Sequence, residues 1–173
     1  FPLFYEYGPY SDPATGQAGT WTKEIKGSPT STEWTKTYTD MLGRTWKTEY
    51  PDGATSLHSY NAKGQLEKTV DPDGVTTLYR YNPQGELEYT VLDLHRNGQI
   101  DWAGPDRIRR LVRSIQPASG GRPDRTRIDT YLWKDGQSNG TLVERTETST
   151  DGLQTWHTLW PQPQTAVTTH TAI

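Results

Sequence analysis

Oxygen-bearing side chains recur at alternate positions of residues 93–106, a pattern that suits the coordination of a hard cation. Carboxylate or amide residues occupy the first, fifth, seventh and ninth positions of a calcium-binding loop. Gly98 supplies the sharp bend of such a loop, and Ile100 supplies its apolar anchor. The spacing therefore predicts a Ca²⁺ site whose ligands are Asp93, Asn97, the backbone carbonyl of Gln99, Asp101 and Asp106.

Two positions of this loop differ from the calcium pattern. The third is His95, whose imidazole is a poor ligand for calcium, and the twelfth is Gly104 in place of a glutamate. Asp106, two residues further on, is the carboxylate that we expect to replace it. The alternative interpretation is a tight turn in which the aspartate side chains accept hydrogen bonds from their own backbone. The sequence leaves both interpretations open.

The sequence contains no recognisable motif for covalent or acid–base catalysis. Glu86 and Glu88 share one strand face, but the paired acids of a glycan-active enzyme are a spatial arrangement that sequence does not display. No glycine-rich phosphate loop links a strand to a helix. The histidines are scattered outside any serine or cysteine motif, at His58, His95, His157 and His170. We predict that the protein is not an enzyme, and a glycan-active enzyme is the less favoured alternative.

Aromatic rings are abundant, with seven tryptophans and ten tyrosines against two phenylalanines. Exposed rings of this kind stack on sugars, so a carbohydrate-binding module with a glycan partner is the main alternative function. The competing use is the core, because Trp and Tyr bury large areas. We expect most tryptophans to form the core and one or two to remain free for a ligand. The core candidates are Trp34, Trp46, Trp133, Trp156 and Trp160.

A basic run over residues 107–113 alternates like a strand with one solvated face. The net charge of the chain is −3, which gives no general attraction to nucleic acid or to an anionic membrane. No apolar run approaches the roughly 18 residues that a membrane span needs. We therefore expect neither a nucleic-acid partner nor a membrane span.

The elements that position these residues are predicted to be β-strands. Hydrophobic residues make up only 31% of the chain, against about 45–50% in a typical globular domain, and Thr, Gly and Pro are abundant. No stretch of ten residues keeps a helical period. There is no cysteine, so no disulfide constrains the fold. The chain begins with Phe1 instead of methionine, and we expect a fragment or a processed product.

Residues 39–92 repeat themselves with a step of 21 residues. Three related hexapeptides begin at Thr39, Tyr60 and Tyr81, and a Pro-Asp-Gly marker ends at Gly53 and again at Gly74 with the same step. Such a period indicates one supersecondary unit per repeat. Runs rich in Thr, Tyr, Val and Leu lie between the turn signals, so each unit is predicted to be strand, turn, strand, turn. The turn glycines are expected to have positive φ angles.

The hexapeptide combines Tyr or Thr with Asp or Asn, two variable residues, Gly, and Arg or Gln, and it resembles the YD-repeat (RHS-repeat) family. The tyrosine is Thr39 in the first copy, the aspartate is Asn61 and Asn82 in the others, and the arginine occurs only as Arg44. The resemblance implies a long strip of β-hairpins that coils into a shell and carries no catalytic residues. It also implies an extracellular or cell-surface location.

We therefore predict an all-β fold made of consecutive antiparallel hairpins in a coiled or curved sheet of about a dozen strands. Residues 1–173 are expected to form a single β-repeat unit. Residues 1–38 form the leading hairpins, residues 39–92 the three repeats, residues 93–106 the aspartate-rich insertion and residues 107–173 further degenerate hairpins.

The first and last predicted strands, Leu3–Tyr7 and Thr165–Ile173, are rich in β-formers and carry no lysine at the ends of the strip. Unpaired edges of this kind template pairing with another strand. We expect them to pair with other repeats of the same protein or with identical chains. The predicted function is a non-catalytic structural segment of a large secreted or cell-surface protein, serving as shell, scaffold or self-assembling unit of a filament or tube.

Overall fold

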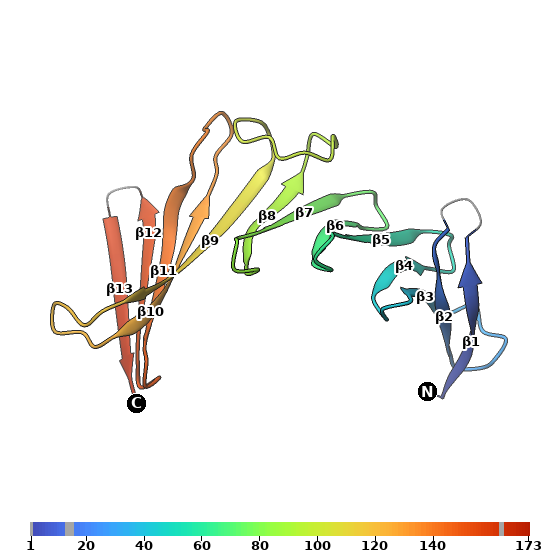
Figure 1. The fold of residues 1–173 in the computed structure, drawn as a ribbon. Coiled ribbons are helices and arrows are strands. Elements are labelled where there is room, and N and C mark those ends of the chain that lie inside the picture. Colours follow the sequence, from blue (N-terminus) through green and yellow to red (C-terminus); the bar gives the residue numbers. More distant parts are fainter. Residues whose placement is uncertain (1, 13–15, 163–164) are drawn as a thin grey trace. The chain divides into compact units, whose positions relative to one another are not determined.

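The computed structural model describes residues 2–12, 16–162 and 165–173, and these residues form antiparallel strands without any helix (Figure 1). The strands follow one another in sequence order. This confirms the predicted all-β fold of consecutive antiparallel hairpins. Within the described residues the strands are β1 (Leu3–Ser11), β2 (Ala18–Lys26), β3 (Trp34–Asp40), β4 (Thr45–Glu49), β5 (Thr55–Tyr60), β6 (Leu66–Val70), β7 (Thr76–Tyr81), β8 (Leu87–Asp93), β9 (Arg107–Gln116), β10 (Arg125–Leu132), β11 (Thr141–Ser149), β12 (Gln154–Gln162) and β13 (Thr165–Ala172).

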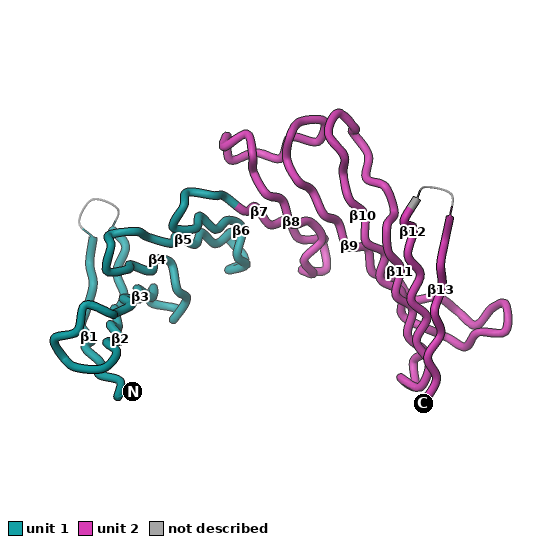
Figure 2. The backbone as a smooth tube through the Cα atoms, turned by 180° about the vertical axis from the view of Figure 1, so that it is seen from behind, with its two compact units in different colours: residues 1–76 teal, residues 77–173 magenta. Residues whose placement is uncertain are grey.

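The chain divides into two compact units, residues 1–76 and 77–173 (Figure 2). Unit 1 contains β1 to β6, and unit 2 contains β8 to β13 with all but the first residue of β7. Consecutive strands pair antiparallel in each unit, from the β1–β2 hairpin to the β12–β13 hairpin. That the whole chain acts as a single repeat unit stays a prediction.

The repeat turns share one backbone geometry. The N–H groups of Gly43, Gly64 and Gly85 donate to the carbonyl three residues earlier, at 2.9, 2.8 and 2.9 Å. Gly53 and Gly74 close the alternate turns in the same way, both at 3.0 Å. All five glycines have φ between 77° and 87°, a left-handed conformation that side chains with a Cβ rarely adopt. The predicted 21-residue register is therefore confirmed.

The Asp or Asn that opens each hexapeptide turn also caps it. Oδ1 of Asp40 accepts the backbone N–H groups of the second and fourth residues after it, both at 2.9 Å. Oδ1 of Asn61 accepts the equivalent pair at 2.9 and 3.0 Å, and Oδ1 of Asn82 accepts the fourth N–H at 2.9 Å. Short polar side chains favour turns for this reason, so the second residue of the repeat has a structural task.

The first and fifth side chains of each turn form a further hydrogen-bonded pair. Oδ2 of Asp40 accepts Nε–H of Arg44 at 2.8 Å. Nδ2 of Asn61 donates to the glutamine four residues later at 3.0 Å, and Nδ2 of Asn82 donates to Glu86 at 2.9 Å. In the second and third turns the first residue is Asn, whose amide donates the hydrogen bond. The fifth residue is therefore an acceptor, Gln65 or Glu86, in place of the donor Arg44. The departures from the family pattern are thus matched changes that keep the pair.

Each unit has a small core of its own. In unit 2, Leu78, Val91 and Ile108 form a buried cluster, on which Tyr89, Ile100 and Trp133 pack. In unit 1, the rings of Tyr10, Tyr38 and Trp46 lie 5.0 to 5.7 Å apart between centroids, close to the edge-to-face distance that aromatic pairs favour.

Tryptophans contribute less to the core than the sequence analysis predicted. Of the five core candidates, Trp156 alone is buried, whereas Trp34, Trp46, Trp133 and Trp160 are half-buried. Within the described residues, only loops and long side chains pack on the faces of the hairpins. Large aromatic rings there remain partly exposed to solvent.

The first strand is longer than predicted, because β1 continues through Pro9 to Ser11. Pro9 lacks the N–H group that a central strand needs, and the sequence therefore predicted an end at Tyr7. Within unit 1, however, β1 pairs with β2 on one side and is the edge strand. An edge strand tolerates proline, because the backbone N–H groups on its outer side form no hydrogen bond with another strand.

Candidate functional site

The predicted calcium loop connects the end of β8 to the start of β9 (Figure 1). Asp93 and Asp106 stand at its two ends and are 3% and 2% exposed. Asp101 is half-buried, and Asn97 and Gln99 are exposed. The predicted ligands therefore differ widely in burial, with the two flanking carboxylates inside and the central amides outside.

Asp106 holds the loop through three backbone groups. Its Oδ1 accepts the N–H groups of Leu94 and His95 at 3.0 and 3.3 Å. Its Oδ2 accepts the N–H of Asp101 at 3.0 Å. A buried carboxylate costs free energy unless hydrogen bonds satisfy it, and these donors meet that need.

The other two carboxylates are also engaged within the loop. Asp93 accepts the backbone N–H groups of Asn97 and Gly98, at 3.3 Å and 2.8 Å. Oδ2 of Asp101 lies 2.6 Å from Nδ1 of His95 and accepts Nδ2–H of Asn97 at 3.0 Å. His95 thus contacts a predicted ligand side chain.

These contacts match the alternative interpretation of a turn whose aspartates bond their own backbone. Among the described residues, no group of three or more His, Cys, Asp or Glu side chains is arranged to hold a metal ion. Calcium binding by Asp93, Asn97, Gln99, Asp101 and Asp106 stays a prediction.

Beside this loop lies an open groove of about 460 Å³ on unit 2. Its residues come from β7, β8 and the second half of the loop: Arg80, Tyr81, Glu88, Tyr89, Gln99, Ile100 and Trp102. Trp102 is 42% exposed, and its ring meets Tyr89 edge-on with centroids 5.2 Å apart. The sequence analysis did not single out Trp102. Its position within a polar insertion, outside any strand pattern, was the available signal.

A cluster of charged side chains surrounds Glu147 on β11, and the sequence analysis missed it as well. Oε1 of Glu147 accepts Nε–H of Arg125 and Nη2–H of Arg127, both at 2.8 Å. Oε2 accepts Nη1–H of Arg122 at 2.5 Å. Glu147 and Arg125 are only 2% and 5% exposed. Three guanidinium groups therefore share a single buried carboxylate.

The electrostatics of this cluster favour a permanent charge on Glu147. Burial by itself raises the pKa of a carboxyl group, but the hydrogen bonds from Arg125 and Arg127 outweigh it and hold the pKa of Glu147 below its ordinary value. A carboxyl group whose pKa is lowered in this way stays ionised near neutral pH and has no proton to donate. We therefore assign the cluster a role in stability.

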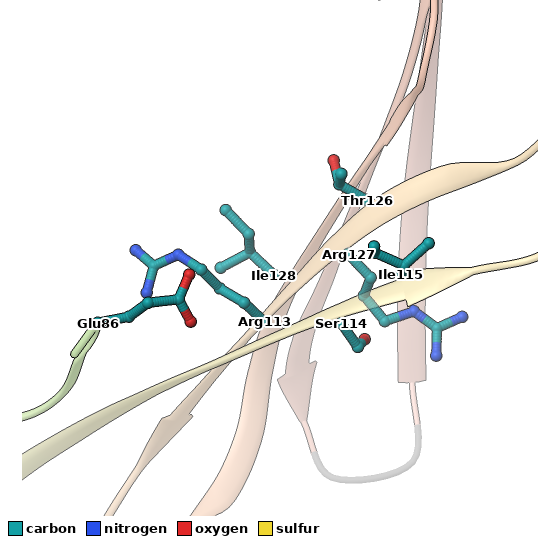
Figure 3. A pocket seen from close by; sticks show the side chains of 7 residues that line it. All are labelled: Glu86, Arg113, Ser114, Ile115, Thr126, Arg127 and Ile128. Carbon is teal, nitrogen blue, oxygen red and sulfur yellow. The ribbon is translucent and has the colours of Figure 1, made fainter. Parts of the chain in front are cut away.

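A second groove, of about 440 Å³, lies over β9 and β10 (Figure 3). Glu86 and Arg113 point toward one another at one end, whereas Ile115 and Ile128 present apolar surface that is 78% and 36% exposed. Cross-strand pairing places Arg113 opposite Ile128 and Ile115 opposite Thr126.

The basic run forms β9, as predicted. Arg107 and Arg109 flank the buried Ile108, and Arg110 pairs with Glu88 at 2.6 Å between Nη2 and Oε1. Arg107 forms an ion pair with Asp135. Acidic neighbours therefore neutralise part of the positive strand.

None of the described residues forms a helix of the length and hydropathy that crossing a membrane requires. A search of the curated proteins finds no match to this chain. The RHS Repeat family model matches residues 60–93, the stretch from the second hexapeptide to the end of β8. This match confirms the resemblance seen in the hexapeptides, and the chain carries an RHS repeat.

Proposed function

We propose that this chain is a non-catalytic structural segment of a large secreted or cell-surface repeat protein. The RHS repeat at residues 60–93 supports a structural role, because proteins with such repeats are generally structural and usually extracellular or at the cell surface. The hexapeptide side chains support it too, since the Asx residues of the repeats cap their own turns.

The observation that carries the proposal is the open edge of β13. It pairs with β12 on one side, and all eight of its residues are exposed. The strand contains four threonines and neither lysine nor proline, the residues with which soluble proteins commonly protect an edge. Its pairing with β12 shifts register between Leu159 and Gln162. Among the described residues of unit 2, no further strand covers this edge.

An edge of this kind is suited to receive another hairpin. In one version, the strip continues into further repeats and serves as part of a shell or scaffold. In the other, β13 pairs with the edge strand of an identical chain. Such head-to-tail pairing is a heterologous contact, which gives a filament or tube unless the rotation closes. In both versions the main-chain groups of β13 supply the contact.

Light scattering coupled to gel filtration tests the self-assembling version over a range of protein concentrations. We expect the mass of the parent chain to rise with concentration. Val167→Lys places a charge on the edge strand at a residue that is 54% exposed and should keep the chain monomeric.

The matched control is Ile115→Lys, which changes a residue that is 78% exposed on the interior strand β9. It should assemble like the parent, because it leaves the edge unchanged. If Ile115→Lys abolishes assembly and Val167→Lys does not, the contact is made through a sheet face and the edge argument is wrong. A parent chain that stays monodisperse and monomeric, with both termini resistant to protease, leaves only the scaffold version.

A further inference from the structure

The groove beside Trp102 has the composition of a small-molecule site. Its residues on β7 and β8 lie within the RHS repeat match, whereas Gln99, Ile100 and Trp102 come from the insertion that follows it. Its volume of about 460 Å³ falls within the roughly 300–1,000 Å³ of ligand pockets. Such pockets combine an apolar or aromatic wall with a few polar groups that fix the orientation of the ligand. The groove has both components.

The aromatic wall is formed by rings that fix one another. Trp102 is T-shaped against Tyr89, and its centroid lies 5.9 Å from that of Trp133. Tyr89 and Trp133 pack in turn on the buried cluster of unit 2. Since Trp102 nevertheless remains 42% exposed, it offers a held aromatic surface to solvent.

The polar groups of the groove include both donors and acceptors. Arg80 and Gln99 are exposed, and they contribute a guanidinium and an amide. Glu88 uses its Oε1 for Arg110, at 2.8 Å to Nε and 2.6 Å to Nη2. A groove that mixes these groups with an aromatic face offers hydrogen-bond partners to hydroxyl groups and a flat apolar surface to C–H groups.

The loop that carries Gln99 and Trp102 is fixed at several points. Ile100 between them packs on the buried cluster of unit 2. The N–H of Asp101 donates to the buried carboxylate of Asp106 at 3.0 Å. The N–H of Gly104 donates to the carbonyl of Asp101 at 3.0 Å, and a Cβ at Gly104 would lie 2.7 Å from that of Asp101. The loop is therefore held in place before a ligand arrives, which lowers the entropy cost of binding.

We propose that this groove binds a saccharide, with a pyranose ring stacked on Trp102 and its hydroxyl groups hydrogen-bonded to Arg80, Glu88 and Gln99. A purely apolar ligand would leave the polar groups of the groove unpaired, which costs binding free energy. A polyanion would find one exposed arginine beside a carboxylate. A sugar meets both parts of the groove, because each pyranose ring has an apolar face and a rim of hydroxyl groups.

Isothermal titration calorimetry tests the proposal with a panel of neutral hexasaccharides: cellohexaose, xylohexaose, maltohexaose and chitohexaose. At least one should bind the parent chain. Trp102→Ala should weaken that binding about tenfold or more, since aromatic anchors dominate recognition, and tenfold corresponds to about 1.4 kcal/mol. Gln99→Ala should weaken it severalfold without touching the core.

The matched control is Tyr7→Ala on β1, which removes an aromatic ring that is 80% exposed in unit 1. It should bind like the parent. If Trp102→Ala perturbs the fold by circular dichroism, Gln99→Ala and Arg80→Ala decide the question, because both alter exposed side chains. The proposal is overturned if no panel member binds, or if binding survives Trp102→Ala and Gln99→Ala, or if Tyr7→Ala abolishes it. None of these results bears on edge-strand assembly.

Discussion

Replacing Glu147 by glutamine should destabilise the chain more than any other isosteric change of a charged side chain on β11. Glu147 is 2% exposed, and its partner Arg125 is 5% exposed. With the carboxylate gone, three guanidinium groups face one another, and that of Arg125 is buried. Breaking a buried ion pair from one side costs about 3–5 kcal/mol. For a chain of this length, that corresponds to a fall in melting temperature of at least about 6 °C.

The assay is thermal and urea unfolding, followed by circular dichroism at neutral pH. Glu144→Gln is the matched control, because Glu144 lies three residues earlier on the same strand and pairs with a half-exposed His157 at 2.8 Å. Such a surface pair contributes about 0–1 kcal/mol. Arg122→Ala should also cost little, about 1 kcal/mol, because two guanidinium groups still hold Glu147.

The pH dependence gives an independent check. The folded-state pKa of Glu147 lies below its ordinary value of 4.5, so its contribution to stability is present above that value and is lost as the pH falls through the folded pKa. Stability of the parent chain should therefore drop faster below about pH 4.5 than that of Glu147→Gln. The reasoning is refuted if Glu147→Gln costs less than 1 kcal/mol, or if Arg122→Ala costs as much.

Three further predictions follow from the turns, from Tyr38 and from the insertion. Asn82→Asp should destabilise the chain by about 1 kcal/mol, because the hydrogen bond from Asn82 to Glu86 is lost and two carboxylates meet. Adding Glu86→Arg should restore the stability, measured by urea unfolding. Burial and the hydrogen bond to Glu49 raise the pKa of Tyr38 to about 12. The contribution of Tyr38 to folding stability is therefore complete below about pH 10 and lost as the pH rises through 12. In an ultraviolet titration of tyrosine ionisation, Tyr38→Phe should lack that late step. If the insertion binds Ca²⁺, a chelator lowers the melting temperature of the parent but not of Asp101→Ala; no effect on the parent contradicts the calcium prediction.

The repeat could be predicted from sequence because its determinants are local. A glycine every 21 residues fixes a positive φ, and the Asx residue three positions earlier supplies the capping oxygen. Both signals lie within five residues of the turn that they specify. Pro9 misled the sequence analysis because its effect depends on whether the strand lies at an edge, and strand order is not a local property.

The arginine cluster and the groove depended on pairing between distant segments. Arg127 and Glu147 are cross-strand partners whose register follows from the β10–β11 pairing. Tyr89 and Trp102 meet because the insertion folds back so that Ile100 reaches the core. The alternation of side chains along a strand predicts which face of the sheet each residue lies on, but it does not predict which residue of the neighbouring strand lies opposite. These sites therefore required the structure.

The same Asx chemistry has opposite consequences in the repeats and in the insertion. In the repeats, the oxygens of Asp40 and Asn61 are committed to short turns, so each copy adds a hairpin. In the insertion, the committed residues are Asp93 and Asp106, which bond the backbone of a longer loop. That loop is thereby held in one conformation while Trp102 remains open to solvent. If the groove binds a saccharide as proposed, recognition arises where a turn is enlarged, because the buried caps of Asp93 and Asp106 hold a loop whose exposed side chains the hairpin does not need.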